Sequence, residues 1–333
     1  MAEHLPHRPE IKPGLRQVWR DDTTLQIGLT PDAGVVIAGL GPLDAQLIEH
    51  LDGTRRLSDL ERWARARGAD PGRVRALLDL LAGAGVLTGQ PADRAHLHRL
   101  GPDRHQELRP DALAWSVTYP DAGDGFELLA RRTRRPVLLI GRGRLATACL
   151  AALSPTAVPI EHAQTTRDGL ATVARLAGDD RHSAYRLVVL VEEDAVSTAV
   201  GSALLAEGLP HLVVLAGADR ASVGPLVVPG RSACLRCLEL ARTDRDPGWP
   251  AVAAQLDSPA AAVRGESALT QLVAALVALQ VTCWVDERRT PASVGATLTV
   301  ALPDGLTCRR TWQRHPRCGC SWLPGALRSD AAG

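Results

Sequence analysis

The sequence VLLIGRGRLA, residues 137–146, joins an apolar run to a glycine-rich turn and then to a segment of helical character. A buried strand that turns directly into a helix is the opening unit of a doubly wound sheet. Two further apolar runs, LVVLV at 187–191 and LVVLA at 212–216, alternate with segments of helical periodicity. This alternation predicts an α/β fold built on a parallel, doubly wound sheet.

The same turn matches part of the fingerprint for dinucleotide binding. Glu161 stands 20 residues after Gly141, at a spacing where an acidic side chain can accept a hydrogen bond from a ribose hydroxyl. Ala146 replaces the third glycine of the fingerprint, and two arginines lie within the turn itself, flanking Gly143. The pattern therefore favours a turn kept for packing of the strand on the helix, with a bound nucleotide as the alternative.

Four of the seven cysteines form two close pairs, Cys234 with Cys237 and Cys318 with Cys320. Four thiolates can surround a tetrahedral zinc ion without leaving an open coordination position, as in closed structural sites. We therefore predict one structural zinc ion, with His315 as an alternative ligand and buried or reactive thiols as the alternative explanation. The remaining three, Cys149, Cys283 and Cys308, lie in apolar patterns typical of core positions.

Residues 16–85 have a different pattern, with three short strands followed by three helices. The strands are RQVWR, TTLQIGLT and GVVIAGL, and the helices begin near Pro42, Ser58 and Pro71. Prolines and glycines then interrupt the sequence up to residue 132. We predict a first, α+β domain over 1–90, a linker with some local structure over 91–132, and the α/β domain over 133–333.

Composition excludes several classes of protein. The formal net charge is +1, so overall charge implies neither a nucleic-acid-binding nor a membrane-binding surface. The N-terminal residues lack the apolar segment of a signal peptide, and no stretch of about 18 uncharged apolar residues follows. These features predict a soluble cytoplasmic protein.

Residues 208–238, GLPHLVVLAGADRASVGPLVVPGRSACLRCL, resemble the E1-like superfamily of ThiF and MoeB type adenylating proteins, which have a Rossmann-type sheet. PGRSACLRCLELARTDRDPGWP at 229–250 and RHPRCGC at 314–320 are similar to the ThiF-like partner proteins of azole- and azoline-forming cyclodehydratases. This resemblance implies an N-terminal winged helix that binds the leader of a ribosomally made precursor peptide. WRDDTTLQIGL at 19–29 and HLDGTRRLSDL at 50–60 fit that order of elements.

The chain departs from adenylating members of the superfamily, which use a lysine, an asparagine-containing segment and an aspartate for magnesium. Lys12 is the only lysine, asparagine is absent, and Asp194 lacks the asparagine that usually follows. The resemblance therefore implies a scaffold with no catalytic residue of its own and no need for ATP. A separate YcaO-type cyclodehydratase would carry out the ATP-dependent step. A ThiF-like adenylyltransferase is the alternative.

The same resemblance implies β-augmentation, in which the leader adds a strand beside a helix. The strand over 34–40 and the helix from Pro71 would form the groove. The implied contact residues are Val35, Val36, Ile37, Arg73, Val74, Leu77 and Leu81. Core packing of the apolar members and a solvated arginine face are the alternatives.

Two other questions stay open at this point. A winged helix can also enter DNA, but the candidate recognition helix at 71–83, PGRVRALLDLLAG, has two arginines and is then largely apolar, which argues against base reading. The apolar helix at 269–284 could lie in the core or at the interface of a homodimer.

Overall fold

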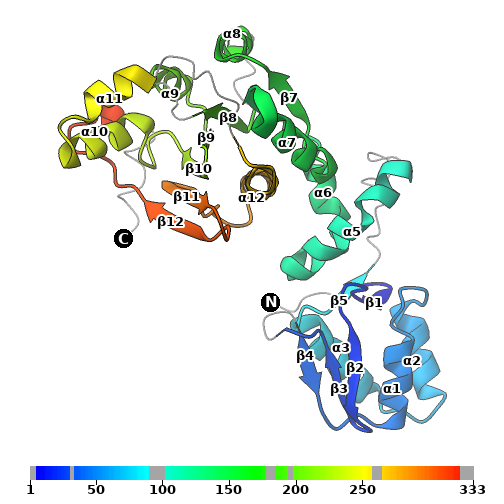
Figure 1. Ribbon diagram of the computed structural model, residues 1–333. Coiled ribbons are helices and arrows are strands. Elements are labelled where there is room, and N and C mark those ends of the chain that lie inside the picture. The colour runs from blue at the N-terminus through cyan, green and yellow to red at the C-terminus, as the bar shows by residue number, and fades with distance from the viewer. Residues whose placement is uncertain are drawn as a thin grey trace. The chain divides into compact units, whose positions relative to one another are not determined.

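The computed structural model describes residues 5–30, 34–89, 102–177, 185–193, 198–256 and 265–322 (Figure 1). The chain divides into two compact units, Met1–Arg131 and Arg132–Gly333. Each unit has a hydrophobic core of its own.

The N-terminal unit contains a three-stranded antiparallel sheet in the order β2-β3-β4 and three helices. The elements are β2 (Gln17–Asp21), β3 (Thr24–Ile27), β4 (Val35–Ile37), α1 (Pro42–Glu49), α2 (Leu57–Arg65) and α3 (Pro71–Gly83). A second, two-stranded sheet pairs β1 (Pro9–Ile11) with β5 (Leu87–Gly89). The three strands and three helices predicted from the sequence are all present, although the first two strands are slightly displaced.

The core of this unit explains why these segments fold. Leu25 and Ile27 of β3 are fully buried, as are Leu60 of α2 and Leu78 of α3. Asp70 caps α3, because its carboxylate accepts hydrogen bonds from the backbone N–H groups of residues 72 and 73. Alternate residues of β3 and one face of each helix thus bury their apolar side chains together.

The segment predicted as a linker contains further helices. They are α5 (Pro102–Thr118), η1 (Pro120–Ala122) and α6 (Phe126–Arg132). Lys12 is fully buried, and its ammonium group donates hydrogen bonds to the backbone oxygens of Ser116 at 2.7 Å and Pro120 at 2.9 Å. The ring of His105 stacks on Phe126 with a centroid separation of 3.8 Å. Residues 102–131 therefore pack with the N-terminal unit.

The C-terminal unit is built on a seven-stranded sheet in the order β12-β11-β10-β9-β8-β6-β7. The strands are β6 (Val137–Gly141), β7 (Ile160–Ala163), β8 (Leu187–Glu193), β9 (His211–Ala216), β10 (Arg220–Val227), β11 (Ala296–Ala301) and β12 (Thr307–Thr311). Strands β7, β6, β8 and β9 are parallel, whereas β10, β11 and β12 continue the sheet in antiparallel pairs. The sheet is therefore mixed rather than wholly parallel. The short turn between β9 and β10 leaves no room for a crossover helix, which forces antiparallel pairing.

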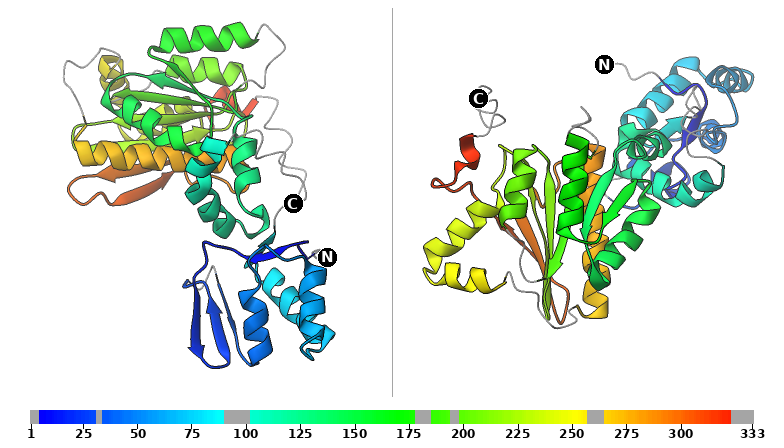
Figure 2. Two further views of the ribbon diagram at one scale, coloured as in Figure 1. Left: turned by 90° about the vertical axis from the view of Figure 1, so that its right-hand side faces the viewer. Right: turned by 90° about the horizontal axis from the view of Figure 1, so that it is seen from above.

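Helices cover both faces of this sheet (Figure 2). One face packs against α7 (Gly143–Leu153) and α12 (Ser267–Asp286). The other carries α8 (Thr166–Ala177), α9 (Thr198–Ala206) and α10 (Leu235–Arg245), followed by α11 (Trp249–Leu256). The predicted α/β architecture with a doubly wound core is thus present in the parallel half.

Helix α12 has the length and hydropathy of a membrane span, but 56% of its most apolar window is buried inside the unit. Val273, Val277 and Val281 are fully buried against the sheet. At its end, Asp286 accepts hydrogen bonds from the guanidinium of Arg132 at 2.6 and 2.7 Å, and both side chains are buried. These contacts are those of a core helix.

Candidate metal centre and peptide-binding edge

The four cysteines predicted as metal ligands lie together. Cys234 is the residue that caps α10, and Cys237 lies in the first turn of that helix. Cys318 and Cys320 approach from the segment around η3 (Gly319–Trp322). The Sγ atoms lie 3.7 Å apart for Cys234 and Cys237, 3.6 Å for Cys234 and Cys318, and 3.4 Å for Cys237 and Cys320. All four sulfurs lie within 4.8 Å of one another, and all four residues are buried.

This geometry fits a closed tetrahedral site. With Zn–S bonds of about 2.3 Å, the edges of the sulfur tetrahedron are about 3.8 Å long. The observed separations are close to that value, and they are far longer than the S–S bond of a disulfide, which is about 2.05 Å. The four sulfurs are therefore compatible with a structural zinc ion, and a four-sulfur set would leave no coordination position for a substrate.

Neighbouring polar groups surround the cluster. The backbone N–H of His315 donates to the Sγ of Cys237 at 3.3 Å. Hydrogen bonds from the Cys234 thiol and from that N–H lower the pKa of Cys237 to about 4. Thiolates are the form that binds zinc, so the hydrogen bond from the backbone N–H of His315 favours metal binding by Cys237.

His315 itself lies beside the four sulfurs and is not one of the ligand cluster. Its Nδ1 accepts a hydrogen bond from the backbone N–H of Arg317 at 3.2 Å, which leaves the proton on Nε2 to bond Asp244 at 2.7 Å. The hydrogen bond from His315 and the charge of Arg317 lower the pKa of Asp244. Both ring nitrogens of His315 are thus already engaged.

The other three cysteines differ in exposure. Cys149 is buried in the core, and burial raises the pKa of its thiol to about 12. Cys283 is half-buried on α12. Cys308 lies exposed on β12, so the prediction that it is a core residue is wrong. Every residue of this terminal strand is exposed, and apolar patterning cannot distinguish an edge strand of this kind from a buried one.

The glycine-rich turn has a clear packing role. Gly141 ends β6 with a φ of +149°, and a Cβ atom there would lie 2.3 Å from the backbone oxygen of Val191 in β8. Gly143 begins α7 with a φ of +86°, a conformation that favours glycine. The two glycines thus bring β6 against β8 and allow the chain to turn into α7.

Of the two acidic residues predicted near this turn, the structure describes only Glu161. Glu161 lies on β7, and its carboxylate accepts a hydrogen bond from the hydroxyl of Tyr185. The neighbouring His162 bonds the backbone oxygen of Gly141 through Nε2 at 2.8 Å. Asp194 lies outside the described residues.

In the N-terminal unit, β4 forms one edge of the three-stranded sheet. It pairs with β3 through Val35, Val36 and Ile37, and its other edge has no strand partner among the residues the structure describes. Val36 is 46% exposed, Val35 is half-buried and Ile37 is buried. Only Val36 of the three therefore presents a large apolar surface to solvent.

The α3 residues predicted to line the groove are mostly internal. Val74, Leu77 and Leu81 are buried in the core of the unit. Arg73 is exposed, but its guanidinium bonds the carboxylate of Asp44, with a shortest distance of 2.6 Å, and the backbone oxygen of Gly39 at 2.8 Å. This arginine ties α3 to α1 and to the segment after β4.

Burial opposes ionisation of Asp44, but hydrogen bonds from Arg73 and from the backbone N–H of Gly41 outweigh it and lower the pKa of Asp44. Two further α3 residues, Ala76 and Leu80, are exposed although the sequence pattern did not single them out, and Leu80 is 46% exposed. The sequence of α3 contains more apolar residues than one face of a helix can bury, and this excess predicts that some of them are exposed.

Comparison with known proteins gives a likeness of fold. No protein-family model matches the sequence, and no curated protein matches it. The heterocyclase TruD superposes with a TM-score of 0.66 at 16% identity over 95% of this chain. PaaA gives a TM-score of 0.64 at 16% identity over 91% of this chain and 100% of its own, and E. coli MccB in complex with MccA gives 0.61 at 12% over 94% and 99%.

The chain spans 43% of the length of TruD, so more than half of that heterocyclase has no counterpart in the match. At these identities the likeness establishes the fold and nothing more. The predicted α/β fold is thereby supported, and this chain is similar in fold to TruD, PaaA and MccB.

Proposed function

We propose that this protein is a non-catalytic scaffold, which binds the leader of a ribosomally made precursor peptide and delivers it to a separate YcaO-type cyclodehydratase. The product would be a peptide with thiazole or oxazole-type rings. The likeness to a heterocyclase supports this proposal, because the match covers nearly all of this chain and less than half of TruD. In this proposal the ring-forming activity belongs to the partner polypeptide.

The observation that carries the proposal is the edge of β4 that pairs with no described strand, together with the contact of Arg73 in α3 with Gly39 just after β4. The N-terminal unit would act as a winged-helix recognition element, with a peptide strand added along β4. The backbone of β4 supplies the hydrogen bonds, each of which contributes about 1 kcal/mol net. Val36 and Leu80, both 46% exposed, supply apolar contacts.

The buried α3 residues then have a supporting role. Val74, Leu77 and Leu81 fix α3 against the core, while Arg73 holds the segment after β4 through its bond to Gly39. A groove with rigid walls loses little conformational entropy when the peptide binds. Acidic leader residues would have to compete with Asp44 for Arg73.

The proposed function depends on tethering the precursor peptide to the scaffold through its leader. A leader held by the scaffold keeps the rest of the peptide near the active site of the partner, so successive cyclisations become nearly intramolecular. Such tethering needs no catalytic residue in this chain. Within the scaffold, a zinc ion bound by Cys234, Cys237, Cys318 and Cys320 would join the start of α10 to the segment at 318–320 and stabilise the C-terminal unit.

The experiment is a fluorescence-anisotropy titration of a labelled leader peptide, taken from a precursor encoded beside this protein. We expect micromolar or tighter binding. Val36→Glu and Leu80→Glu should each weaken binding at least tenfold, because each places a charge on the proposed apolar contact surface. Val18→Glu is the matched control, since Val18 is an exposed valine on β2 at the opposite edge of the same sheet.

The alternative function is ATP-dependent adenylation. It is favoured by the fold shared with MccB, which is known in a complex with AMPCPP and MccA. If the wild-type protein fails to bind the leader but exchanges pyrophosphate into ATP in the presence of the peptide, the scaffold proposal is wrong and the alternative stands.

A further inference from the structure

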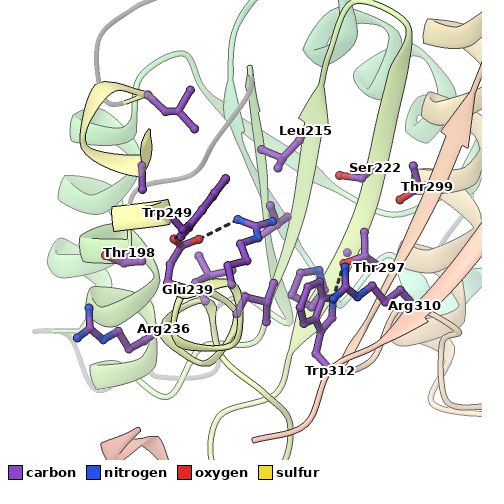
Figure 3. A pocket seen from close by; sticks show the side chains of 18 of the residues that line it. Thr198, Leu215, Ser222, Arg236, Glu239, Trp249, Thr297, Thr299, Arg310 and Trp312 are labelled. Carbon is purple, nitrogen blue, oxygen red and sulfur yellow. Dashed lines mark hydrogen bonds and ion pairs between the residues drawn. The ribbon is translucent and has the colours of Figure 1, made fainter. Parts of the chain in front are cut away.

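A cavity of about 760 Å³ lies on the face of the C-terminal sheet that carries α10 and α11. Figure 3 shows Glu239 and Trp249 on the helical side of this cavity, and Thr297, Arg310 and Trp312 on the side of the strands. Its lining includes none of the residues of the glycine turn at 141–143 and none of the four clustered cysteines. The cavity is therefore distinct from both sites described above.

Two tryptophans and two arginines alternate along its wall. The guanidinium of Arg242 lies 4.9 Å from the ring centroid of Trp249 and 6.0 Å from that of Trp312. On the strand side, the guanidinium of Arg310 lies 4.1 Å from the ring of Trp312. Stacking on an indole restricts the guanidinium plane and leaves its N–H edge available for a planar anion.

The polar ends of the indoles are already satisfied. Trp249 donates its ring N–H to Glu239, and Trp312 donates to the hydroxyl of Thr297 at 2.8 Å. Glu239 also pairs with Arg242 at 2.8 Å. The indole rings can therefore contact a ligand through their faces. The ion pair of Glu239 with Arg242 offsets the negative charge of Glu239, which would otherwise repel an anionic ligand.

The charged and apolar side chains that line the cavity indicate which class of ligand fits it. The described lining contains four arginines and a single acidic side chain, Glu239. The wall also contains apolar side chains, among them Leu215 and Leu238. A magnesium-bound nucleotide would need a carboxylate ligand for the metal ion, and the single carboxylate of the described lining, Glu239, is already engaged by Trp249 and Arg242. A carboxylate next to an apolar side chain fits both the arginine and the leucines.

We propose that this cavity is a second peptide subsite, which binds a carboxylate-bearing peptide segment through Arg310 and seats the adjacent apolar side chain against Leu215 and Leu238. This inference rests on the proposed function, since it assigns the C-terminal unit a contact with the same class of ligand. It adds selection for acidic residues outside the leader-binding edge of β4.

The test uses two probes that differ by one functional group, N-dansyl Leu-Leu-Glu amide and N-dansyl Leu-Leu-Gln amide, titrated into the full-length protein. We expect the Glu probe to bind at least tenfold more tightly, a difference of about 1.4 kcal/mol. Arg310→Gln should abolish that preference. Arg309→Gln is the matched control, because Arg309 lies next along β12 and bonds the backbone oxygen of Ala292 instead of lining the cavity.

Failure to bind either probe, equal binding of both, or a preference that survives Arg310→Gln would each overturn the subsite. Displacement of the bound Glu probe by magnesium-ATP at stoichiometric concentration would also overturn it, by assigning the cavity to a nucleotide. Leader titrations on Arg310→Gln separate the two proposals: unchanged leader affinity is expected. A wild-type protein that binds the leader but shows no preference for the Glu probe would reject the subsite alone, whereas a wild-type protein that prefers the Glu probe but binds no leader would reject the proposed function alone.

Discussion

At the scale of single residues, spacing in the sequence was enough to find the cysteine cluster, because a close pair of thiols at each of two segments has few other uses. Pairing of Arg73 with Asp44 was not predictable in the same way. The two residues are 29 positions apart, and their contact depends on how α1 packs against α3. The exposure of Cys308 was also missed, since it depends on whether another strand continues the sheet.

The buried amine of Lys12 gives a direct test of the N-terminal unit. Lys12→Met keeps most of the side-chain volume but leaves the backbone oxygens of Ser116 and Pro120 without their donor. We expect a loss of about 1–3 kcal/mol in the free energy of unfolding of this unit. Urea denaturation measures it, with Arg55→Met, an exposed cation in the same unit, as the neutral control. Equal stability of the two variants would contradict this account.

His211 predicts a dependence of stability on pH. Burial lowers the pKa of His211 from 6.5 to about 4, and its Nε2 has no hydrogen-bond partner among the described residues. The unfolded chain therefore binds a proton below pH 6.5 that the folded chain does not bind until about pH 4. The contribution of His211 to the free energy of unfolding is therefore full above pH 6.5. About 3 kcal/mol of it is lost as the pH falls to 4.

Calorimetry between pH 7 and 4 should show this loss in the C-terminal unit. His211→Phe should flatten that part of the pH profile. A profile identical to that of the wild type would show that His211 is not the group responsible.

At the scale of elements, three of the four parallel strands, β6, β8 and β9, were predictable because each contains an uninterrupted apolar run. Strand β10 was not, because Gly224 and Pro225 lie in its middle and both normally interrupt a strand. The structure accommodates them where the pairing of β10 with β9 shifts register between Val223 and Leu226. A local irregularity of this kind has no signature in periodicity.

The junction of β6 with α7 allows a comparison of two glycines. Gly141→Ala would place a methyl group 2.3 Å from the backbone oxygen of Val191, so β6 and β8 would have to separate. We expect a loss of about 3 kcal/mol in unfolding free energy. Gly143→Ala meets nothing within 4 Å and carries only the conformational cost of its positive φ, about 1–2 kcal/mol. Chemical denaturation of both variants tests the order, and a milder effect at Gly141 would contradict the packing role.

At the scale of the whole molecule, length predicted about two domains, and the structure contains two compact units. The sequence suggested a linker over 91–132, whereas the described part of that stretch packs largely with the N-terminal unit. Pro102 and Pro110 in α5 weaken a sequence-based helix assignment, although a proline is tolerated in a first turn. The contact of α5 with Lys12 involves residues more than 100 positions apart and leaves no local pattern.

The two units should respond differently to loss of metal. Cys237→Ser removes one of four clustered sulfurs, so we expect bound zinc to fall from about one equivalent per chain to well below it. Thermal unfolding of the C-terminal unit should shift to lower temperature, while that of the N-terminal unit should not move. Metal analysis and calorimetry measure the two effects, and Cys308→Ser is the control because its thiol is exposed and outside the cluster. Retention of a full equivalent of zinc in Cys237→Ser would reject the assigned ligand set.

The buried position of Lys12 also determines how the protein meets amine-reactive reagents. Lys12 supplies the only side-chain amine in the sequence, and it is fully enclosed by the N-terminal unit. A reagent that acylates lysine can reach this amine only when that unit opens. The rate of acylation at Lys12 therefore reports how often the N-terminal unit opens, and mass spectrometry of one modified peptide measures that rate. A ligand bound to the N-terminal unit would lower the rate of acylation.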